Sequence, residues 1–222
     1  MPESAGGQGG RIERHWRLLV VLFWLAVAGY MLFVRWAAIR GFALADTDDN
    51  LRIVQVRALL AGQDWYDLRQ YRLNPPHGAD IHWSRVVDLP IAALKLLLAP
   101  LLGGRAAETA AVAAAPLLPM LVAMASVAVI ARRLIDRRAF ALAVALLVCA
   151  GSARGMWLPL RLDHHGWQLA MLAVALAALA DPKRARGGAL LGGATALSLA
   201  IGLEMLLYLA LAGAATVLRW AI

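Results

Sequence analysis

The sequence predicts an all-α, polytopic membrane protein with about six transmembrane helices, and three observations support this class. Hydrophobic residues make up 62% of the 222 residues, and the mean hydropathy is +0.67. Several windows of about 17 to 25 residues are mostly apolar, which is the length that crosses a bilayer core of about 30 Å. The basic residues lie in short clusters between these windows, as they do in cytoplasmic loops.

The net charge of +8 does not by itself indicate a nucleic-acid partner. Arginine and lysine are concentrated at the ends of apolar segments, where positive charge orients a membrane protein. We therefore expect membrane lipids as partners and no nucleic acid. The single cysteine, Cys149, lies inside an apolar segment and excludes an intrachain disulfide.

The first span is expected at about residues 18–38. It follows a Gly-rich, then basic, segment at residues 1–17, which we interpret as a cytoplasmic N-terminal tail. The apolar segment is too long for the core of a signal peptide, and residues 35–38 form a poor cleavage site. The span is therefore expected to remain in the protein.

The densest basic cluster, residues 132–138, follows an apolar segment at about residues 110–131. The positive-inside rule places this cluster in the cytoplasm, so residues 39–109 are expected to form a first external loop. Within that loop, residues 89–102 are apolar but would reach only about 21 Å as a helix. Two prolines and a lysine interrupt them, which favours an interfacial or re-entrant helix.

The remaining apolar segments alternate in direction and complete one transmembrane domain over residues 18–222. The expected spans are about 139–156 outward, 166–180 inward, 189–203 outward and 205–220 inward, with a basic cytoplasmic loop at 181–186. Residues 51–60 combine two arginines with regularly spaced apolar residues, which predicts an amphipathic helix parallel to the membrane.

Two clusters of ionisable residues fall on the external face in this topology. Residues 46–49 read Asp-Thr-Asp-Asp, and residues 163–165 read Asp-His-His. Each has a structural alternative, since Asp46 and Asp163 could simply cap the helices that follow them. Together they indicate a cation site, because like charges repel unless a cation joins them. Carboxylates suit magnesium or manganese, and an imidazole favours manganese.

An aromatic and basic segment, residues 63–85, separates the two clusters. Its rings could stack on a sugar or an isoprenoid, and its arginines could pair with phosphate oxygens. The alternative is an aromatic belt at the level of the lipid headgroups, where Trp and Tyr are enriched.

This combination of motifs resembles the N-terminal half of C-type (GT-C) glycosyltransferases, and is most similar to bacterial relatives of the oligosaccharyltransferase catalytic subunit. The spacing of Asp46 and Arg52 resembles the motif of the family's first external loop, which contains a metal-binding Asp. The second motif, usually Asp-x-Asp or Asp-x-Glu, reads Asp163-His164-His165 here, with His165 at the usual acidic position. The resemblance covers about residues 11–222.

The resemblance implies a metal-dependent transfer of a sugar or oligosaccharide from a polyprenyl-(di)phosphate-linked donor to an acceptor. The reaction is expected on the external, periplasmic face of a bacterial inner membrane. Family members continue through further spans, so we expect this chain to be the N-terminal part of a longer protein and inactive alone. The alternative is a non-catalytic membrane protein, such as a transporter or assembly subunit, whose external acidic clusters bind ions or a partner.

The resemblance also implies a role for individual residues. Asp46 and Asp163 are the expected catalytic residues and would bind a divalent metal (Mn or Mg) together with His165. A larger set is expected to support these ligands or to contact the acceptor and the donor: Asp48, Asp49, His164 and Glu204 as supporting or acceptor-binding residues, and Arg52, Arg57, Trp83 and Arg85 at the donor phosphate or sugar. For Glu204, the alternative is a charge at the level of the headgroups.

Overall fold

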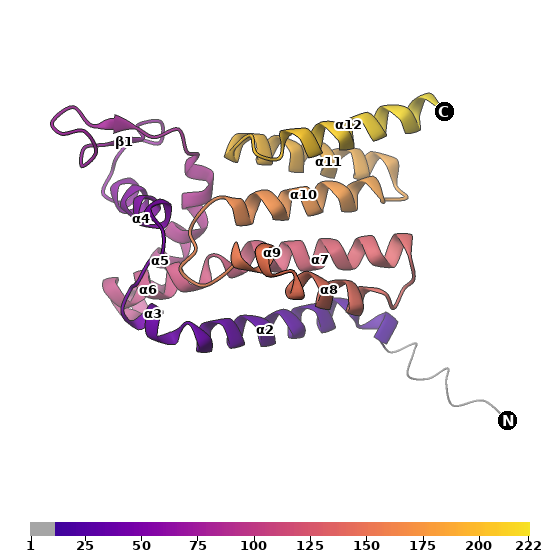
Figure 1. The fold of residues 1–222 in the computed structure, drawn as a ribbon, viewed down its shortest axis with the longest axis horizontal. Coiled ribbons are helices and arrows are strands. Elements are labelled where there is room, and N and C mark those ends of the chain that lie inside the picture. Colours follow the sequence, from indigo (N-terminus) through magenta and orange to yellow (C-terminus); the bar gives the residue numbers. More distant parts are fainter. Residues whose placement is uncertain (1–11) are drawn as a thin grey trace.

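The computed structural model describes residues 12–222, and this part of the chain is mostly helical. Within this part of the chain, a bundle is formed by six helices that lie side by side and alternate in direction (Figure 1). They are α2 (Trp16–Val34), α7 (Leu117–Leu134), α8 (Phe140–Cys149), α10 (His165–Leu179), α11 (Arg184–Ile201) and α12 (Leu206–Ala221). The packing is centred on two of them: α7 contacts α2, α8 and α10, and α10 also contacts α11 and α12.

The long connection between α2 and α7 folds against one end of this bundle (Figure 1). It comprises α3 (Trp36–Arg40), α4 (Thr47–Leu60), the antiparallel strands β1 (Arg69–Gln70) and β2 (Ala79–Asp80), the 3-10 turn η1 (Arg85–Val87), α5 (Asp88–Leu102) and α6 (Gly104–Ala114). Helix α5 packs against α4 and α6. The helices expected at 51–60 and 89–102 are thus present as α4 and α5.

Two expected spans are interrupted. The segment at 139–156 forms α8 and a short helix, α9 (Gly151–Gly155), because Ala150 between them leaves the helical conformation (φ −70°, ψ 92°). The sequence there contains glycine and serine, which are weak helix formers. The segment at 110–131 belongs to a longer unit in which α6 and α7 are separated only near Pro116, where the ring removes a backbone donor.

Small residues allow the last three helices to pack closely. Ala175 and Ala178 of α10, Ala194 of α11 and Ala212 of α12 are all buried in one apolar cluster. Such residues let helix backbones approach each other, as is common between helices in membranes. A second apolar cluster joins α2, α7, α8 and α10, and a third lies under the α2–α7 connection.

Two helical segments, Trp16–Val34 and Gly104–Leu134, have the length and apolar composition needed to cross a membrane. Helices α2 and α12 also expose large apolar side chains, including Phe33, Leu207 and Trp220. An extended exposed apolar surface indicates contact with lipid or with another protein. The prediction of a mostly helical chain is confirmed, whereas a total of six membrane spans stays a prediction.

Candidate functional site

The start of α4 and the segment before α10 meet at the end of the bundle that carries the α2–α7 connection (Figure 1). Asp46 is the N-cap of α4: its backbone is extended, and its Oδ1 accepts a hydrogen bond from the amide of Asp48 at 3.1 Å. An acidic side chain at this position satisfies a free amide and suits the positive end of the helix dipole. Asp46 therefore does act as a helix cap, and its other oxygen, Oδ2, accepts a hydrogen bond from Arg161.

Asp49 joins α4 to the second cluster. Its side chain is fully buried, and its Oδ1 accepts hydrogen bonds from the amides of Leu162 at 2.7 Å and Asp163 at 3.2 Å. Burial raises the pKa of the Asp49 carboxyl, although these amides and Arg161 act in the opposite direction. Asp49 thus positions the backbone of the second cluster, 113 residues away in the sequence. Its neighbour Asp48 is half-buried.

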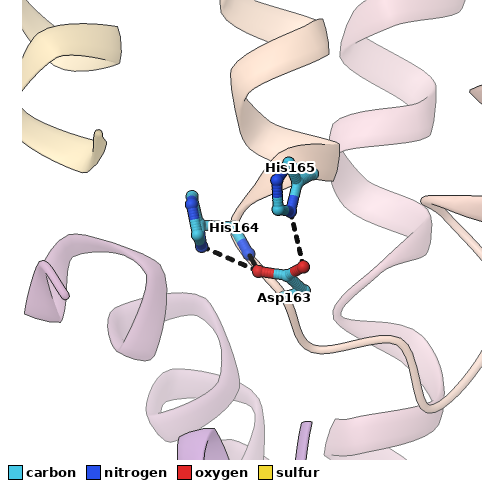
Figure 2. A group of neighbouring side chains, drawn as sticks. All are labelled: Asp163, His164 and His165. Atoms are coloured by element: carbon cyan, nitrogen blue, oxygen red, sulfur yellow. Dashed lines mark hydrogen bonds and ion pairs between the residues drawn. The ribbon is translucent and has the colours of Figure 1, made fainter. Parts of the chain in front are cut away.

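Asp163, His164 and His165 form a compact group just before α10 (Figure 2). Asp163 Oδ2 lies 2.5 Å from His165 Nδ1, and Asp163 Oδ1 lies 2.7 Å from His164 Nδ1. The two imidazole rings are stacked with centroids 4.5 Å apart. One potential ligand atom from each residue lies within 4.8 Å of the others, which suits a shared metal ion. Asp163 and His164 are buried, whereas the His165 side chain is 38% exposed and opens the group to solvent.

Glu204 joins the group from the connection between α11 and α12. Its Oε1 lies 2.7 Å from His164 Nε2, and its Oε2 accepts a hydrogen bond from Gln168 Nε2 at 2.8 Å. Gln168 is itself fully buried and also donates to the carbonyl of Ser198 in α11. Glu204 is therefore more than a charge at the end of a helix: it fixes the side of His164 that faces away from Asp163.

Arg161 was not among the expected site residues, yet its guanidinium lies between the two acidic clusters. Its Nη1 is 2.7 Å from Asp46 Oδ2, and its Nη2 is 3.3 Å from Asp163 Oδ2. Nη1 is also 3.5 Å from Asp49 Oδ2. The sequence predicts a metal ion at this position, and the structure places an arginine there. The signal available in the sequence was the spacing between Arg161 and Asp163, because residues two apart in an extended segment point to the same side.

The charges of the group reinforce one another. Burial opposes the charge on Asp163, but His164 and His165 outweigh it and hold the pKa of the carboxyl well below its usual range. Burial likewise opposes protonation of His164, and contacts with Asp163 and Glu204 outweigh it and raise the pKa of the imidazole. The hydrogen bond from Arg161 lowers the pKa of Asp46. A metal ion that bound a His164 nitrogen would therefore compete with a proton for it.

Arg52 and Trp83, expected at the donor phosphate or sugar, contact each other in the interior. The Arg52 guanidinium lies 4.7 Å from the centroid of the Trp83 ring and donates to Asp88 Oδ1 at 3.0 Å. The Arg52 and Asp88 side chains are 1% and 0% exposed, respectively. Burial raises the pKa of Asp88 even though Arg52 and Arg85 oppose this. In the structure the Arg52 charge thus balances Asp88, and its expected contact with a donor stays a prediction.

Arg85 is also buried and holds the aromatic loop together. It donates to the backbone carbonyls of Gln55, Trp65 and Asp67, and to the side-chain oxygen of Gln63. Its expected contact with a donor phosphate also stays a prediction. The burial of Arg85 was not foreseen, because a sequence pattern does not distinguish a buried arginine from an exposed one.

Arg57 differs from these two arginines because its side chain is half exposed. It donates to both carboxylate oxygens of Glu108, at 2.6 to 3.2 Å. Lys95 donates to the same carboxylate at 2.7 Å. Arg57 therefore lies on the surface of the α4–α6 region. Its hydrogen bonds are with Glu108 and not with residues of the Asp163 group.

Comparison with family models, with curated proteins and with solved structures finds no match to this chain. The resemblance to C-type glycosyltransferases therefore depends on the sequence motifs alone.

Proposed function

We propose that this chain forms the metal-binding part of a membrane glycosyltransferase that uses a polyprenyl-linked sugar donor. The observation that carries the proposal is the convergence of the two acidic motifs, which lie more than a hundred residues apart and meet through Asp49 and Arg161. A helix cap alone explains neither the burial of Asp49 nor its bonds to the amides before Asp163.

The distribution of charge supports an external site. The basic segments 132–138 and 183–186 lie at the end of the bundle opposite the Asp163 group (Figure 1). If the six helices of the bundle cross the membrane, the positive-inside rule assigns the basic end to the cytoplasm and the Asp163 group to the outer face. An impermeant thiol reagent should then label cysteines introduced at Gly78 from outside the cell, while cysteines introduced at Asp136 stay protected. Labelling of Asp136→Cys from outside would contradict this orientation.

The residues of the group fit a divalent metal. His164 Nδ1 is buried and, although close to Asp163, lacks a properly oriented hydrogen bond. Asp163, His164 and His165 would hold the ion, and Glu204 would orient His164. Two imidazoles with a carboxylate favour manganese or another transition metal over magnesium. When bound, such an ion supplies positive charge to the phosphate that leaves the sugar.

Arg161 determines how Asp46 takes part. In the structure its guanidinium occupies the space between Asp46 and Asp163, so Asp46 can reach the ion only if Arg161 turns away. A guanidinium is well suited to pair with a phosphate. We therefore assign to Arg161 the contact with the donor phosphate that the resemblance implies for Arg52, Arg57 and Arg85. Binding of the donor phosphate to Arg161 would then release Asp46, which could reach the ion.

The test compares Asp163→Ala with Asp64→Ala, which removes an exposed carboxylate from the α2–α7 connection. Purified protein is titrated with Mn²⁺ by calorimetry. Transfer from a polyprenyl-linked sugar is assayed in membranes from cells that express the complete gene product. Asp163→Ala should lose both Mn²⁺ binding and sugar transfer, while Asp64→Ala retains both. Full Mn²⁺ affinity in Asp163→Ala, or transfer that survives a chelator, would refute the proposal.

A non-catalytic membrane protein remains the alternative, and one observation favours it. Arg161 already neutralises the acidic clusters, so the fold does not require a metal ion for charge balance. In that case the purified protein should bind no Mn²⁺ and its membranes should show no sugar transfer. Arg161→Gln should then lower only the free energy of unfolding.

A further inference from the structure

A groove of about 360 Å³ lies between α2 and the break that separates α8 from α9. It shares no lining residue with the Asp163 group. Most of its lining is apolar, and two arginines complete it: Val27, Tyr30, Met31, Val148, Arg35 and Arg154 are among the lining residues. The groove thus combines an apolar channel with positive charge.

The two arginines differ from Arg52, Arg85 and Arg161 in their polar contacts. Within residues 12–222, neither the Arg35 nor the Arg154 side chain makes an ion pair or a hydrogen bond, whereas Arg52, Arg85 and Arg161 each make several. The Nε of Arg35 is also buried and without a partner. A buried charged donor without an acceptor is costly, so an anionic group at this position would stabilise the protein.

We propose that this groove binds an anionic phospholipid of the bilayer, with one acyl chain along the apolar lining and the phosphate at Arg35 and Arg154. Arginine pairs readily with phosphate oxygens, and basic pockets between membrane helices select anionic headgroups. The neighbouring face of α2 exposes apolar side chains such as Leu22 and Phe33, which would contact the remaining lipid. The inference depends on the membrane placement proposed above, but not on metal binding or sugar transfer.

The test uses native mass spectrometry of the purified chain in detergent, titrated with dioleoyl phosphatidylglycerol. The variant Arg35→Gln/Arg154→Gln should bind this lipid at least tenfold more weakly than the unmodified protein. The matched control Arg40→Gln/Arg72→Gln removes two exposed arginines that line no part of the groove, and should bind within twofold. Dioleoyl phosphatidylcholine should bind at least tenfold more weakly to the unmodified protein.

A second variant, Val27→Trp, fills the groove without changing its charge and should also weaken binding. The melting temperature of each variant in the same detergent, measured in parallel, shows whether the rest of the fold is intact. Equal affinity for the two lipids, or unchanged binding in both groove variants, would overturn the proposal. Displacement of the lipid by millimolar inorganic phosphate, or tighter binding of polyprenyl phosphate than of phosphatidylglycerol, would assign the groove to another ligand.

Discussion

The two ends of the helix bundle use the same kinds of charged residue in different environments. At the basic end, Arg138 pairs with Glu13 at 2.9 Å while their side chains stay 60% and 26% exposed. At the other end, Arg52 pairs with Asp88 at 3.0 Å with almost no exposure of either side chain. Water screens the first pair and is excluded from the second.

This difference explains what each set of charges can do. Solvated arginines can report the orientation of the chain in a membrane while contributing little to stability. Buried charges must be matched by partners, so each one restricts the positions of others. The Asp163 end is therefore a connected network in which Asp49, Arg161 and Glu204 each fix a neighbour.

The largest effect should come from breaking the buried pair. Arg52→Met leaves Asp88 buried with only the more distant Arg85, and should lower the free energy of unfolding by about 3 to 5 kcal/mol. Arg138→Met at the opposite end should cost about 1 kcal/mol or less, because its partner is solvated. Unfolding in detergent micelles, followed by tryptophan fluorescence, measures both. Similar losses in the two variants would show that the two ends do not differ as described.

The metal proposal predicts a smaller but specific effect at one end. His165→Ala should weaken Mn²⁺ binding by about 10- to 100-fold, the range seen when the environment of a metal site is damaged. His15→Ala, which removes an exposed histidine at the basic end, should leave the affinity unchanged. Calorimetric titration of the two variants shows whether the loss of Mn²⁺ affinity is specific to His165 or follows the removal of any histidine. Equal weakening by both would exclude a site at His165.

Removing the arginine between the acidic clusters should strengthen metal binding. Arg161→Gln eliminates a positive charge 3.3 Å from Asp163, and should raise Mn²⁺ affinity by roughly three- to tenfold, or about 1 kcal/mol. Arg72→Gln removes an exposed charge elsewhere in the α2–α7 connection and provides the control. Weaker Mn²⁺ binding in Arg161→Gln would mean that the guanidinium chiefly maintains the geometry of the group.

The pH dependence of the metal-free protein should be modest and have a defined sign. The raised pKa of His164 means that its ion pairs stabilise the fold below its ordinary value of 6.5 and are lost as the pH rises through the raised pKa. The lowered pKa of Asp163 makes its contribution persist above 3.8 and disappear only on strong acidification.

The melting temperature in detergent, measured with a chelator present, should therefore fall as the pH increases through the neutral and mildly alkaline range. His164→Gln should flatten this part of the curve, while His15→Ala leaves its shape unchanged. Parallel curves for the unmodified protein and His164→Gln would remove His164 as the cause.

Local patterns in the sequence were sufficient to predict most helices and the existence of the two polar clusters. Helices α4 and α5 agree with the expected segments at 51–60 and 89–102, because helical periodicity and composition are local properties. The break at Ala150 was not predicted, since an apolar segment gives little indication of where packing interrupts it.

By itself, the sequence determined the helical class, the alternation of apolar segments with basic loops, and two acidic motifs that could meet. The tertiary structure decided which charges are buried and which partners they have. It placed Arg161 between Asp46 and Asp163, brought Glu204 to His164, and enclosed Arg52 with Asp88. These outcomes depend on contacts between residues distant in the sequence, and the free energy of burying a charge is set by the groups that surround it.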